Sequence, residues 1–127
     1  MKIFATLVTA LILAAPALAQ LTDVHTQQKA RAQNACSGLV ARHEAAVAGG
    51  MVSSYLPEDC SCFADSIIWE GWDDYEMEST GEYMTEADAI LVADTLSSAP
   101  TIDDAMTLIY ESISAPGSSV LSNCVAK

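Results

Sequence analysis

Four cysteines constrain the fold of this 127-residue chain more than any other feature of the sequence. They are Cys36, Cys60, Cys62 and Cys124. In an exported protein an even number of cysteines predicts disulfides, here two cross-links within one small domain. Zinc is the competing interpretation, but structural zinc sites usually take two close-spaced ligand pairs, and only Cys60 and Cys62 are close. We therefore expect two disulfides and no bound metal.

The N-terminal region decides whether these cysteines reach an oxidising compartment. Lys2 is followed by an apolar run over residues 3–15, by Pro16 and by a small-residue ending at Ala19. This order is typical of a secretory signal peptide that is cleaved after Ala19. The run is also shorter than the about 20 apolar residues that a membrane-spanning helix needs. We predict a signal peptide at 1–19 and a single helical domain at 20–127, without a membrane span, in the periplasm or outside the cell.

Helical signals cover most of the predicted domain, and no strand is expected in it. Four segments combine apolar residues three and four positions apart with capping residues at the start and Gly or Pro at the end. These segments are about 22–48, 57–71, 85–97 and 101–115, and a shorter helix is expected around 120–124. In the third segment we expect Ala87, Ile90, Leu91 and Leu96 to be buried. The predicted fold class is all-α, a small disulfide-stapled bundle of four to five helices.

The spacing of Cys60 and Cys62 limits how the cysteines pair. Residues two apart on a helix point about 200° away from each other, so these two side chains face different neighbours. One should reach Cys36 and the other Cys124, which rules out a bridge between Cys60 and Cys62. Two connectivities remain open, and pairing Cys36 with Cys60 and Cys62 with Cys124 is slightly favoured.

The charge balance excludes one class of partner. The chain has 17 acidic and 5 basic side chains and a formal net charge of -12. A nucleic-acid-binding protein needs a clustered basic patch to neutralise phosphates, which five scattered Lys and Arg residues cannot provide. We therefore expect no DNA or RNA partner.

The least helical stretch, residues 69–86, is the candidate binding surface. It interleaves carboxylates with aromatic and Met side chains and contains no basic residue. Its candidate residues are Trp69, Trp72, Asp73, Asp74, Tyr75, Glu76 and Glu78. One interpretation is a solvated acidic connection between helices, and the other is a surface for a basic protein or a cation, because carboxylates steer cations and aromatics supply contact area. The spacing of acids around Gly71 and Gly81 does not fit a regular calcium loop.

The sequence offers no convincing catalytic group. His43 and Glu44 begin like a zinc-protease helix, but the second histidine of that motif is missing. His25 lies 18 residues before His43 on the same predicted helix, roughly 27 Å away, so the two cannot share a centre. We expect both histidines at exposed or edge positions, no catalytic residue and no cofactor.

The cysteine arrangement resembles that of a group of small exported bacterial helical proteins. They share one Cys, then a Cys-x-Cys on a helix, then a C-terminal Cys, here Cys36, Cys60-Ser61-Cys62 and Cys124. The resemblance implies the fold and the compartment but no activity, because these proteins are mostly uncharacterised. Periplasmic acid-stress chaperones are similar in size and helicity but have two cysteines. We predict a non-enzymatic binding or accessory protein; the alternatives are a small-ligand or cation-binding protein, or one resembling those chaperones.

Overall fold

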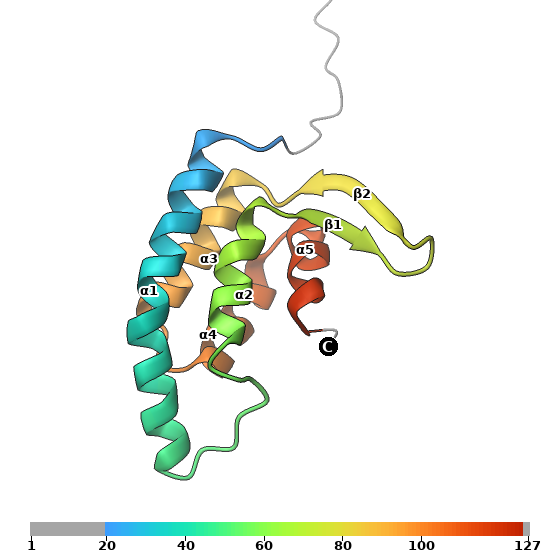
Figure 1. The fold of residues 1–127 in the computed structure, drawn as a ribbon. Coiled ribbons are helices and arrows are strands. Elements are labelled where there is room, and N and C mark those ends of the chain that lie inside the picture. Colours follow the sequence, from blue (N-terminus) through green and yellow to red (C-terminus); the bar gives the residue numbers. More distant parts are fainter. Residues whose placement is uncertain (1–19, 126–127) are drawn as a thin grey trace, which may run out of the picture.

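The computed structural model describes residues 20–125, which form five α-helices, one 3₁₀ turn and a two-stranded sheet (Figure 1). Along the chain the elements are α1 (Asp23–Ala48), α2 (Asp59–Asp65), the 3₁₀ helix η1 (Ser66–Ile68), β1 (Glu70–Asp73), β2 (Glu78–Tyr83), α3 (Glu86–Ser98), α4 (Ile102–Ser112) and α5 (Ala115–Val125). The predicted signal peptide at 1–19 lies outside the described residues. No helix within 20–125 combines the length and apolarity needed to cross a membrane.

The long helix α1 organises the core, with α2 and α3 packed along it (Figure 1). Its buried positions follow the spacing of a single helical stripe. They are His25, Ala32, Cys36, Leu39 and His43. The same core contains fully buried side chains from the other helices, including Phe63, Ile67, Val92, Leu96, Ile102, Ile109 and Leu121. The prediction of a mostly helical fold is thus confirmed for the described residues.

Two disulfides join α2 to α1 and to α5. Cys36 on α1 bonds to Cys60, and Cys62 bonds to Cys124 on α5. The two neighbouring cysteines leave α2 in different directions, as the helical geometry predicts. Of the two connectivities that the sequence left open, the structure has the favoured one.

Side-chain caps begin two of the helices at the predicted threonines. Thr85 accepts a hydrogen bond from the backbone N–H of Asp88, and Thr101 accepts one from that of Asp104. Asp88 is itself buried and also accepts from the N–H groups of Thr85 and Ser114. This carboxylate therefore ties the start of α3 to the connection between α4 and α5.

Three expectations from the sequence are wrong. The fold is not purely all-α, because residues 70–83 form an antiparallel hairpin. Both histidines are buried, each about 1% exposed, because they continue the stripe of α1. Ala87 and Ile90 are exposed on α3, since the helix buries Ala89, Val92 and Ala93 together with Leu96, whose burial was expected.

Candidate functional site

A hairpin extends from the helical body and carries most of the candidate binding residues (Figure 1). Trp69 directly precedes β1, Trp72 and Asp73 lie on β1, Asp74, Tyr75 and Glu76 form the turn, and Glu78 begins β2. The hairpin therefore brings together, on one projecting element, the residues that the sequence singled out. Glu86 belongs elsewhere, because it starts α3 and accepts a hydrogen bond from Thr22 Oγ1 (2.8 Å).

The turn of the hairpin is held by its own side chains. One carboxylate oxygen of Asp73 accepts from the backbone N–H groups of Tyr75 (2.8 Å) and Glu76 (3.2 Å), which is an Asx turn. Met77 closes the turn in the left-handed region, with φ of 55°. As a result the side chains of Tyr75 and Met77 are 95% and 71% exposed. The most apolar groups of the turn are thus displayed to solvent on a locally ordered loop.

The base of the hairpin is ordered by Glu70. Its carboxylate accepts hydrogen bonds from the hydroxyl groups of Ser79 and Tyr83 across the two strands. The hydrogen bond from Tyr83 and the nearby negative charge raise the pKa of Tyr83 above its ordinary value. Gly71 on β1 faces α5, where Ser119 reaches the carbonyl oxygen of Trp72. The hairpin is thereby attached to the helical body mainly through contacts between β1 and α5.

The hairpin carries acidic residues and no basic ones, whereas the basic residues within 20–125 lie on α1. The basic side chains of residues 20–125 are Lys29, Arg31 and Arg42, and all three lie on α1. Arg31 is already paired with Asp94, at 2.6 Å. Because the hairpin carries several carboxylates and no basic residue, its field is not neutralised locally. Exposed aromatic groups within such a field suit recognition of a positively charged surface.

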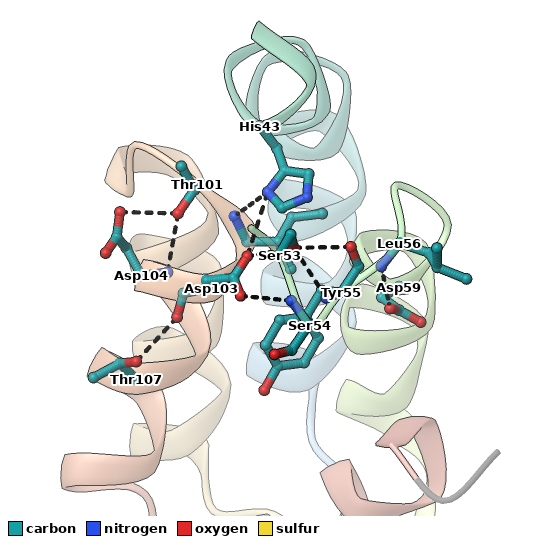
Figure 2. A network of polar contacts seen from close by, with 11 residues as sticks. His43, Ser53, Ser54, Tyr55, Leu56, Asp59, Thr101, Asp103, Asp104 and Thr107 are labelled. Atoms are coloured by element: carbon teal, nitrogen blue, oxygen red, sulfur yellow. Dashed lines mark hydrogen bonds and ion pairs between the residues drawn. The ribbon is translucent and has the colours of Figure 1, made fainter. Parts of the chain in front are cut away.

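A polar cluster that the sequence did not reveal lies at the other end of α1 (Figure 2). Asp103, in the first turn of α4, accepts from the hydroxyl of Ser53 (2.6 Å) and from the backbone N–H of Ser54 (3.0 Å). His43 accepts the N–H of Ile102 through Nδ1 (3.1 Å). The sequence feature that could have predicted the burial of His43 is its position on the helical stripe of α1. Nothing local in the sequence links Ser53 to Asp103, which is fifty residues away.

This cluster contains the residue types of a catalytic triad but is connected differently. In a triad the serine hydroxyl donates to the histidine and the aspartate orients the opposite ring nitrogen. Here Ser53 donates to Asp103, and His43 Nδ1, 3.7 Å from Asp103, takes the N–H of Ile102. Burial would raise the pKa of Asp103, but the hydrogen bonds from Ser53 and Ser54 outweigh it and hold that pKa below its ordinary value. The arrangement fixes the loop after α1 onto α4.

Neither a metal-ligand cluster among the described residues nor a relative of known function points to an activity. Among residues 20–125, no group of three or more His, Cys, Asp or Glu side chains is placed to hold a metal ion. No family model, no curated protein and no solved structure matches the chain. Function therefore has to be inferred from the sites themselves.

Proposed function

We propose that this chain is an exported, non-enzymatic binding protein that docks its hairpin onto a basic partner protein. One observation carries the proposal: Trp72, Tyr75 and Met77 are 40%, 95% and 71% exposed on a projecting hairpin whose charged groups are all carboxylates. Exposed apolar groups cost hydration free energy when they stay in water, whereas in an interface they become contact area. The carboxylates would accelerate encounter with a positively charged partner.

The proposed compartment is the periplasm or the outside of the cell. Two disulfides support it, because such cross-links persist in oxidising environments and are rare in a reducing cytosol. The N-terminal pattern of residues 1–19 supports export on sequence grounds alone.

The test compares the wild-type protein with a variant in which Asp73, Asp74, Glu76 and Glu78 are changed to Asn or Gln. Asp73→Asn keeps a side-chain carbonyl that can accept the turn hydrogen bonds. Pull-down from a periplasmic extract identifies the partner, and association rates are then measured at low and high salt. We expect the variant to associate roughly tenfold more slowly at low salt and to lose most of the salt dependence.

A matched control distinguishes the effect of the hairpin carboxylates from the effect of the net charge of the protein. Changing Asp23, Glu44, Glu58 and Glu111 to Asn or Gln removes the same four charges from exposed positions on helices or at a helix start. This control should associate nearly as fast as the wild type. Equal rates for all three proteins at both salts would reject the hairpin as a docking surface, and recovery of a metal or small molecule in place of a protein would favour a cation- or ligand-binding function.

A further inference from the structure

The C-terminal end of α1 and the loop that follows it line a partly open hollow of about 430 Å³. Small-molecule sites commonly have volumes of about 300–1,000 Å³. The walls are apolar, formed mainly by Val47, Ala48, Leu56 and Pro57, with the ring of Tyr55 beside them. In Figure 1 this end of α1 lies far from the hairpin, so the hollow is separate from the proposed docking surface.

His43 is a polar residue that lines the hollow, and its hydrogen bond defines its neutral tautomer. Its side chain is 2% exposed, and its Nδ1 accepts the backbone N–H of Ile102 at 3.1 Å (Figure 2). A ring nitrogen that accepts a hydrogen bond carries no hydrogen, so in the neutral imidazole the hydrogen is on Nε2. His43 therefore has one N–H donor left to offer.

That donor faces the hollow. No hydrogen-bond partner of Nε2 occurs within residues 20–125, and in this part of the chain no fully buried side-chain nitrogen or oxygen lacks a partner. Nε2 therefore keeps a small accessible surface, and His43 is one of the residues that line the hollow. A nearly buried, unpartnered donor at the bottom of an apolar recess is the arrangement that orients a ligand.

The residues around the hollow indicate which class of ligand it would bind. Glu44 also borders the hollow and the chain has a net charge of -12, so an anion would be repelled. The lining exposes Leu56 (60%) and Val47 (44%) to water, which an apolar ligand would partly cover. We propose that the hollow binds a small neutral apolar molecule with one carbonyl group, whose oxygen accepts the hydrogen bond from His43 Nε2–H.

Two probes of equal shape test this site in the full exported chain. Acetophenone has a phenyl ring and a carbonyl, whereas α-methylstyrene replaces the carbonyl oxygen by a methylene group. Binding is measured by NMR titration, following the backbone amides of Val47, Ala48 and Leu56. His43→Asn keeps an acceptor for the Ile102 N–H, but its shorter side chain places no donor at the position of Nε2. We expect it to weaken acetophenone binding roughly three- to tenfold and to leave α-methylstyrene binding unchanged.

Other measurements keep the site testable if His43→Asn does not fold. Ala48→Phe should fill the hollow and abolish binding of both probes, while Ala30→Phe, at an exposed position about 27 Å away along α1, should not. In wild-type protein, acetophenone but not α-methylstyrene should shift the Nε2 resonance of His43. The proposal is overturned if neither probe perturbs the amides of the hollow, or if His43→Asn weakens both probes equally.

Discussion

At the scale of single residues, two buried histidines attach α1 to the starts of two other helices. His25 accepts the Thr22 N–H through Nδ1 (3.1 Å), and its Nε2 donates to the carbonyl oxygen of Met84 (2.6 Å), just before α3. His43 accepts the N–H of Ile102, the first residue of α4. Each ring thus satisfies a backbone group that a helix end would leave unpaired.

Asp103 gives stability a defined pH dependence. Its pKa in the folded protein is below its ordinary value of 3.8 because Ser53 and Ser54 donate to the carboxylate. A depressed folded-state pKa contributes stability that is complete above the unfolded pKa and is lost as the pH falls through the folded one. We expect Asp103→Asn to remove this contribution, so its free energy of unfolding should fall less than that of the wild type below about pH 4.

The measurement is urea denaturation at a series of pH values. Ser53→Ala should also reduce the acid dependence, because it removes one of the two donors to Asp103. Parallel stability curves for the wild type and Asp103→Asn through the acid range would contradict this assignment.

At the scale of elements, the hairpin depends on a close approach at Gly71. A Cβ atom there would lie 2.7 Å from Thr80 Oγ1 and 3.0 Å from Ser119 Oγ. We expect Gly71→Ala to loosen β1 from α5 and to lower the free energy of unfolding by about 1–3 kcal/mol. Hydrogen exchange should show faster exchange of the hairpin amides, with the amides of α1 much less affected.

Gly38→Ala is the matched control. Gly38 is exposed in the middle of α1, and a Cβ there meets only the end of the flexible Arg42 side chain. Alanine favours the helix over glycine, so this variant should be neutral or more stable by up to about 1 kcal/mol. Unchanged hairpin exchange in Gly71→Ala would show that β1 is not held by contact with α5.

At the scale of the whole molecule, two cross-links restrain the unfolded chain to different extents. The bond between Cys36 and Cys60 closes a separation of 24 residues, and the one between Cys62 and Cys124 closes 62. Loop-closure entropy predicts that each disulfide stabilises the fold by about 3–4 kcal/mol. The disulfide that closes the longer loop should contribute more, by less than about 1 kcal/mol. The double variant Cys62→Ala/Cys124→Ala should therefore be less stable than Cys36→Ala/Cys60→Ala.

Denaturant unfolding of the two double variants without reductant tests this order. Intact mass should first show the wild-type protein about 4 Da below its fully reduced form, since each bridge removes two hydrogens. The reverse order of stability would mean that loss of packing around the fully buried Cys60 outweighs the loop entropy.

The sequence by itself determined the features that depend on neighbouring residues. Thr85 and Thr101 cap helices through groups three positions away, and such local hydrogen bonds are readable in a sequence. The opposite directions of Cys60 and Cys62 follow from helical geometry, which left two pairings for the cysteines. The clustering of aromatics and carboxylates near Trp72 is equally visible, so most of the candidate binding residues could be named in advance.

Only the tertiary structure decided the features that depend on distant partners. The short strand β1 packs at Gly71 on α5, nearly fifty residues later, and this distant contact is why sequence patterning missed the hairpin. The burial of His43 and the pairing of Ser53 with Asp103 likewise require α4 to lie against the end of α1. The pattern of polar and apolar residues along a chain predicts which face of a helix or strand is buried. It does not predict which distant segment covers that face, because such contacts form only when the core packs.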